Sequence, residues 1–119
     1  MKWLDEGLEI GRDLWALPTV ENLIRATDWI ANLPPPTSRQ EIRLRLNISC
    51  HPVCVAVRVG DPEVTRWAYE MQAALLGIVD GDMDWDEQIE EWRRARDSLV
   101  QVLTAVINDP ERRKKWNLE

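Results

Sequence analysis

Residues 84–108 have the sequence DWDEQIEEWRRARDSLVQVLTAVIN, and this stretch gives the chain its helical character. Asp84 followed by acids at 86 and 87 is typical of a helix N-terminus. Apolar residues then recur at alternating spacings of three and four, which predicts one long helix over about 85–108. Its apolar seam resembles that of a helical hairpin or short coiled coil. The seam consists of Ile89, Trp92, Leu99, Leu103 and Val106, with Arg96 at a central position.

The preceding segment predicts a second helix, over 62–79. Asp61-Pro62-Glu63 is a strong helix start, because it combines an N-cap residue, a proline at the first helical position and an acid in the first turn. Gly81 is a natural stop. The expected buried stripe is Val64, Trp67, Ala68, Met71, Leu75 and Ile78.

The N-terminal third predicts two more helices, over 2–16 and about 20–33. Pro18 ends the first and Thr19 caps the second. Gly7 and Gly11 weaken the first helix unless they permit close approach of a neighbouring one. The three prolines at 34–36 stop the second helix and predict a stiff, extended connector.

Residues 41–59 carry a different pattern. Ile42, Leu44, Leu46, Ile48 and Cys50 alternate with polar residues, and valines then alternate at 53–59. A period of two predicts strands, and folding about His51-Pro52 gives a hairpin whose apolar face is in register. That face is Leu44, Leu46, Ile48, Val55 and Val57. The alternative is helical, because residues 38–41 (Ser-Arg-Gln-Glu) form a capping box and Pro52 can begin a short helix.

We therefore expect one domain spanning residues 1–119, predominantly α within the α+β class. Four to five helices would pack with one short β-hairpin near 41–59; the alternative fold is an all-α helical bundle. The length of 119 residues suits a single domain, and the apolar fraction of 45% suffices for a core.

Composition and charge narrow the function classes. The net charge is −6, and residues 67–97 alone carry nine acidic and three basic side chains. This balance counts against direct nucleic-acid binding and favours a protein partner with a basic patch. No apolar run is long enough to span a membrane or to act as a signal peptide, so we expect a cytoplasmic protein. The chain uses Arg far more often than Lys and contains Trp but no Phe, which suggests a GC-rich bacterial or phage genome.

The acidic stretch at 80–91 resembles an EF-hand calcium loop. Asp80, Asp82, Asp84, Asp86 and Glu91 occupy positions 1, 3, 5, 7 and 12 of that motif. Trp85 stands where the motif needs glycine, so an exposed loop followed by a helix start is the simpler interpretation. The same acids could also imitate nucleic-acid phosphate toward a basic partner.

Two further sets of residues could bind a metal or act in catalysis, but neither leads us to assign a metal, a cofactor or a catalytic residue. Cys50, His51 and Cys54 could hold zinc, but the chain has no other Cys or His to complete four soft ligands. Glu87, Glu90 and Asp97 resemble the acid pairs of all-helical, magnesium-dependent nucleotide pyrophosphohydrolases. A single such set on a charged helix is usually a solvated face, so an enzyme is the less favoured alternative.

Seven tryptophans are more than a small domain easily buries, and Trp and Arg dominate interface hot spots. We therefore predict a regulator, adaptor or inhibitor that acts by protein–protein interaction and can form a homodimer through the 85–108 helix. Arg96 would then meet either an acid such as Glu70 or a subunit boundary. The candidate interface is Trp85, Trp92, Arg96, Leu99 and Trp116.

Overall fold

The computed structural model describes residues 2–48, 50–81, 84–115 and 118, and the side chains of all of these except 47, 48, 50 and 51. Within these residues the chain forms seven helices and no strand. The helices are α1 (Lys2–Ala16), α2 (Val20–Ala31), α3 (Arg39–Ile48), α4 (Cys50–Val59), α5 (Pro62–Asp80), α6 (Trp85–Asn108) and α7 (Pro110–Lys115).

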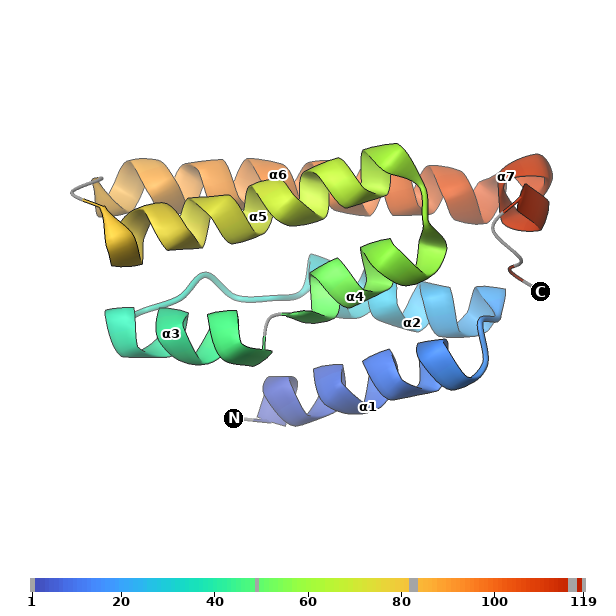
Figure 1. Cartoon of the computed structure of the whole chain (residues 1–119), viewed down its shortest axis with the longest axis horizontal. Helices are drawn as coiled ribbons and strands as arrows, with labels where there is room; N and C mark the ends of the chain where they lie inside the picture. The colour runs from blue at the N-terminus through green and yellow to red at the C-terminus, as the bar shows by residue number, and fades with distance from the viewer. Residues whose placement is uncertain (1, 49, 82–83, 116–117, 119) are drawn as a thin grey trace.

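The long helices α5 and α6 lie side by side and antiparallel, and α1 to α4 cover one side of this pair (Figure 1). α2 packs on α6, while α3 and α4 pack on α5. α1 packs on α2 and α4. The connector at 34–36 runs extended past the core to the start of α3, as its prolines predict. None of the described helices is long and apolar enough to cross a membrane.

The predicted helix starts are confirmed by their capping contacts. The Asp61 carboxylate accepts hydrogen bonds from the Glu63 and Val64 amides, and Asp84 accepts one from the Glu87 amide. Gly60 turns the chain between α4 and α5 with φ of 78°, a left-handed conformation that glycine adopts without a Cβ clash.

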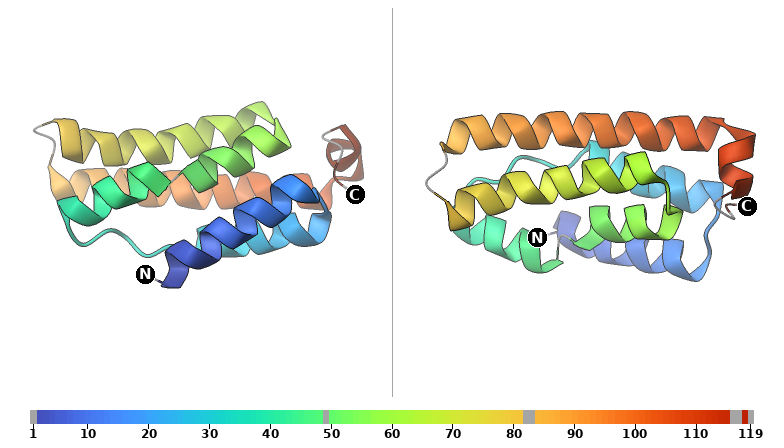
Figure 2. Two further views of the ribbon diagram at one scale, coloured as in Figure 1. Left: turned by 60° about the horizontal axis from the view of Figure 1, so that its bottom comes forward. Right: turned by 45° about the horizontal axis from the view of Figure 1, so that its top comes forward.

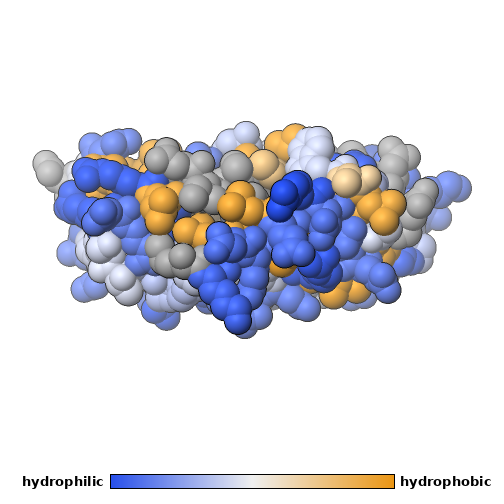
Figure 3. Space-filling model, turned by 90° about the horizontal axis from the view of Figure 1, so that it is seen from below, coloured by the Kyte–Doolittle hydropathy of each residue, from blue (hydrophilic) through white to orange (hydrophobic). Residues whose placement is uncertain are grey.

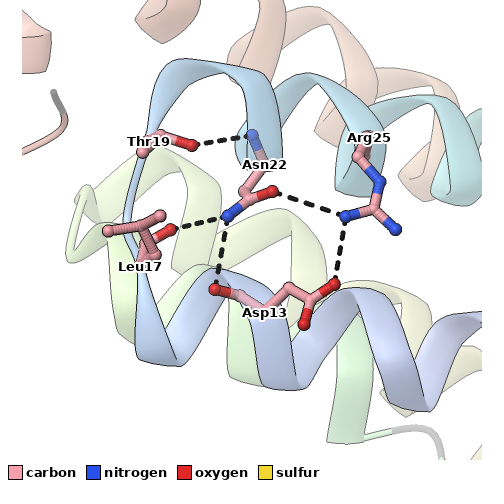
Figure 4. Close-up of polar contacts among 5 residues, drawn as sticks. All are labelled: Asp13, Leu17, Thr19, Asn22 and Arg25. Carbon is pink, nitrogen blue, oxygen red and sulfur yellow. Dashed lines mark hydrogen bonds and ion pairs between the residues drawn. The ribbon is translucent and has the colours of Figure 1, made fainter.

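The corner between α1 and α2 is closed by one asparagine (Figure 4). Asn22 Nδ2 donates to the Leu17 and Asp13 carbonyls at 2.8 and 3.3 Å, and its backbone amide donates to Thr19 Oγ1. Arg25 bridges the two helices by an ion pair to Asp13 at 3.1 Å. These contacts join the end of α1 to the first two turns of α2.

The β-hairpin predicted for 41–59 is wrong, because both halves are helical. The capping box prevails: Ser38 Oγ accepts a hydrogen bond from the Glu41 amide, and the Glu41 carboxylate reaches back to Thr37. The predicted apolar face is split, since Val55 is buried whereas Leu44 and Val57 are 38% and 53% exposed. Leu46 is half-buried, and the side chain of Ile48 lies outside the described residues.

The buried positions of this segment instead follow helical spacing. In α3 they are three residues apart, at Ile42 and Arg45, and in α4 they are Pro52, Val55, Ala56 and Val59. The alternation of apolar residues was misleading because one core position holds an arginine and two surface positions hold Leu44 and Val57. The helix count accordingly rises above the four or five expected.

Candidate functional site

Three tryptophans and one arginine from four helices meet inside the fold. We call Trp3 of α1, Trp29 of α2, Arg45 of α3 and Trp92 of α6 the Trp–Arg site. The Arg45 guanidinium carbon lies 4.4 Å from the centre of the Trp3 ring and 5.6 Å from that of Trp92. Both distances are within the range of cation–π attraction, and Arg45 is only 3% exposed.

Local packing between α1 and α2 positions the aromatic walls. A Cβ at position 7 would lie 2.2 Å from the Trp29 ring, so only glycine leaves room for this indole. Trp29 Nε1 in turn donates a hydrogen bond of 2.7 Å to the Trp3 carbonyl. The close approach that the sequence allowed for at Gly7 is therefore confirmed, and it places Trp29 beside the N-terminal turn of α1.

A carboxylate one turn away balances the charge of Arg45. Its Nη2 donates to Glu41 Oε1 at 3.0 Å, while Glu41 Oε2 accepts from the Thr37 amide and hydroxyl at 2.8 and 2.7 Å. Burial lowers the pKa of Arg45 and Glu41 opposes that shift. Burial also raises the pKa of Glu41, but the bonds from Thr37 and Arg45 outweigh it and hold this pKa below its usual value.

One donor of the guanidinium has no acceptor. Within the described part of the chain, Arg45 Nε is buried and makes no hydrogen bond. A buried unsatisfied donor costs about 1–3 kcal/mol, and more when the group is charged. Most buried donors in folded proteins are paired with a protein atom or an ordered water, so Arg45 Nε is an exception.

A small cavity of about 30 Å³ adjoins this group. Besides the four residues of the Trp–Arg site, its lining consists of Leu4, Leu33, Pro52, Ala68, Met71, Gln72 and Leu75. A single water needs roughly 10–15 Å³ of such space, so the cavity holds a few heavy atoms at most. Its walls are almost wholly apolar; Arg45 and Gln72 are the lining side chains with hydrogen-bonding groups, apart from the indole N–H groups.

The interface predicted from the sequence lies only partly at the surface. Trp92 and Leu99 are fully buried in the core, and Trp85 is half-buried against it. Trp116 lies outside the described residues. The 85–108 seam therefore packs within one chain, and a dimer formed through Trp92 and Leu99 would require the fold to open.

Arg96 has an internal partner that the sequence did not suggest. Its Nη1 donates to the Leu33 carbonyl at 2.9 Å, and its Nη2 lies 3.2 Å from Asp97 Oδ1. The side chain also lies 5.3 Å from the centre of the Trp92 ring. Arg96 thus satisfies a carbonyl just beyond the end of α2, and these partners replace the predicted Glu70.

The acidic residues of the α5–α6 connection are dispersed over exposed positions. Asp84 caps α6, and Glu91 pairs with Arg94 at 3.4 Å. Asp80 and Asp86 are exposed, whereas Asp82 lies outside the described residues. Among the residues that the structure describes, no three His, Cys, Asp or Glu side chains gather around a possible metal position.

The possible zinc ligands lie at the start of α4, and the possible catalytic acids lie on α6. The side chains of Cys50 and His51 lie outside the described residues, and Cys54 is half-buried on α4. Glu87 and Glu90 are exposed on α6, and Asp97 is held by Arg96.

A second feature is an apolar groove on the surface between α1 and α4. We call the residues that line it, Leu8, Gly11, Arg12, Trp15 and Cys54, the α1–α4 groove; its volume is about 450 Å³. Leu8 and Trp15 are 42% and 50% exposed, and the neighbouring Val57 is also exposed. On the face that includes α1 and α3, hydrophobic patches lie between hydrophilic side chains (Figure 3).

Sequence reasoning missed the central residue of the Trp–Arg site. The alternation over 41–50 puts Arg45 among the polar residues of the predicted strand, facing away from its apolar side. The capping box at 38–41 carried the missing signal, because a helix starting there puts Arg45 one turn after Ile42 on the same face. Nothing in the local sequence around Trp3 and Trp29 shows that these two side chains converge on Arg45.

Comparisons with family models, curated proteins and solved structures find no match for this chain.

Proposed function

We propose that this protein is a protein-binding domain whose α1–α4 groove receives an apolar segment of a partner. The observation that carries the proposal is the exposure of Leu8 and Trp15 along one stripe of α1, facing Cys54 of α4 across the groove. Large exposed apolar side chains around a groove are typical of interaction sites, and tryptophan is the residue most enriched in hot spots.

The basic side chains beside the groove indicate the charge of the proposed partner. Arg12 lines it, and the Arg58 guanidinium carbon lies 6.0 Å from the centre of the Trp15 ring. Two arginines next to apolar side chains complement a segment that carries carboxylates beside its apolar residues. The partner proposed for this surface is therefore acidic, whereas a basic partner remains a prediction for the exposed acids of the α5–α6 connection.

Synthetic helical peptides can test this proposal. Two peptides share leucines at positions i, i+3, i+4 and i+7 and differ only in flanking Glu or Lys residues. We expect the Glu peptide to bind at least tenfold more tightly by fluorescence anisotropy. Trp15→Ala and Arg58→Glu should each abolish that preference.

Tyr69→Ala provides the matched control, because Tyr69 is also 50% exposed but lies on α5 and does not line the groove. It should bind both peptides like the wild type. Equal binding of the two peptides, or tighter binding of the Lys peptide, would refute the proposed partner chemistry. Circular dichroism of each variant establishes that its helices are intact.

A further inference from the structure

We propose that the Trp–Arg site is a binding site for a small uncharged carbonyl compound, with a primary amide as its best ligand. The site is separate from the α1–α4 groove, since no residue lines both. Its function therefore stands or falls independently of protein binding.

The first argument is the orphaned donor. The Arg45 side chain is more than nine-tenths buried and lines the cavity, and its Nε–H has no acceptor within the described residues. A carbonyl oxygen is an acceptor that such a planar N–H donor binds readily. The indole rings of Trp3, Trp29 and Trp92 supply flat apolar walls for the rest of a small planar molecule.

The second argument decides the charge of the ligand. Arg45 already forms an ion pair with Glu41, and the hydrogen bonds from Thr37 keep that carboxylate ionised. A carboxylate ligand would add an unbalanced negative charge to an apolar cavity, which is strongly disfavoured. An uncharged carbonyl satisfies Nε–H without that penalty.

The third argument concerns Gln72 on α5, another polar side chain in the lining. A carboxamide both donates and accepts hydrogen bonds, so it can accept the N–H of an amide ligand. The volume of about 30 Å³ restricts the ligand to a few heavy atoms. A small primary amide meets these requirements of size, charge and hydrogen bonding together.

Acetamide, acetone and acetate test the proposal, because each has four heavy atoms in the same planar shape. NMR of the full-length protein would follow the Arg45 Nε–H resonance during each titration. We expect a saturable shift with acetamide, weaker binding of acetone and at least tenfold weaker binding of acetate. Gln72→Met should reduce acetamide binding to the level of acetone.

Arg45→Lys retains the positive charge but removes Nε–H, and it should weaken acetamide binding at least tenfold. Arg94→Met on the exposed side of α6 is the control and should bind like the wild type. The proposal is overturned if Arg45 Nε–H shows contact with water only and no shift with acetamide, or if acetate binds more tightly. This readout uses the wild-type protein, so it holds even if a variant at Arg45 fails to fold.

Discussion

The α5–α6 pair and the α3–α4 segment each consist of consecutive helices, but different interactions hold them in place. α5 and α6 lie antiparallel along each other, whereas α3 and α4 lie end to end (Figure 2). α6 buries an apolar stripe that ends in Leu99, Leu103 and Val106. α3 buries Ile42 together with a cation. The difference shows that a core position can hold a charged side chain such as Arg45, because aromatic rings and a carboxylate take the place of the water that would otherwise solvate it.

The largest loss of stability is expected from a substitution in the core of the α5–α6 pair. Leu99→Asp would place a carboxylate at a position that is fully buried in α6. Burying an unpaired charge costs more than about 4 kcal/mol, which is a large share of the stability of a small domain. We expect loss of the helical circular dichroism signal at 25 °C.

Leu76→Asp is the matched control for this substitution, because Leu76 is 40% exposed on α5. It should change the free energy of unfolding by less than about 0.5 kcal/mol. A Leu99→Asp protein that keeps its helices and only loses self-association would instead favour the dimer seam expected from the sequence.

The second prediction separates a helical α3 from the hairpin that its alternation suggested. Ile42→Ala should cost about 3 kcal/mol, because Ile42 is fully buried, and Leu44→Ala should cost less than about 1 kcal/mol. Urea unfolding of both variants measures the difference. On a strand the two side chains would share one face, so equal losses would contradict the helix.

The sequence predicted those parts of the fold in which local signals agree. Thr19, Asp61 and Asp84 start helices where expected, and the stripe of α6 is buried as its spacing of three and four indicates. These predictions held because capping, proline position and apolar periodicity all favoured the same element.

The α3–α4 segment failed because its signals conflict. Apolar residues alternate along the chain, yet the fold buries Arg45 and exposes Leu44. That exchange depends on Trp3 and Trp92, which are more than 40 residues distant and come from two other helices. A pattern confined to 41–59 contains no information about those rings, so neither the helical register nor the Trp–Arg site could be read from it.

The third prediction tests the walls of the Trp–Arg site. Gly7→Ala introduces a methyl group that would overlap the Trp29 ring. Overpacking of this kind costs about 1–3 kcal/mol, even though alanine is the better helix former. Thermal unfolding should therefore show a lower melting temperature.

A smaller residue at position 29 should reverse that effect. In a Trp29→Leu background, Gly7→Ala is expected to be neutral or stabilising, because the ring it clashes with is gone. If Gly7→Ala raises the melting temperature of the otherwise wild-type protein, the close contact between α1 and the indole is disproved.

The smallest effect expected is a dependence of the folding stability on pH, to which both the α5–α6 pair and the α3–α4 segment contribute. Burial raises the pKa of Asp61, but the bonds from Arg112 and from the Glu63 and Val64 amides outweigh it and lower that pKa overall. Arg112 lies 2.6 Å from Asp61, and this pair ties α7 to the start of α5. The pKa of Glu41 is lowered in the same sense. Each carboxylate therefore binds its proton more weakly in the folded than in the unfolded chain.

The sign of the effect follows from this difference. The stabilisation is fully present above the unfolded pKa of about 4 and is lost as the pH falls through the folded pKa. Asp61→Asn retains a capping side chain but removes the titrating group, so it should flatten the acid limb of the stability curve. Arg112→Gln should flatten it similarly by removing the cause of the shift. Urea unfolding between pH 2 and 7 measures these curves. Acid limbs that match the wild type in both variants would show that this ion pair does not link α7 to the stability of the fold.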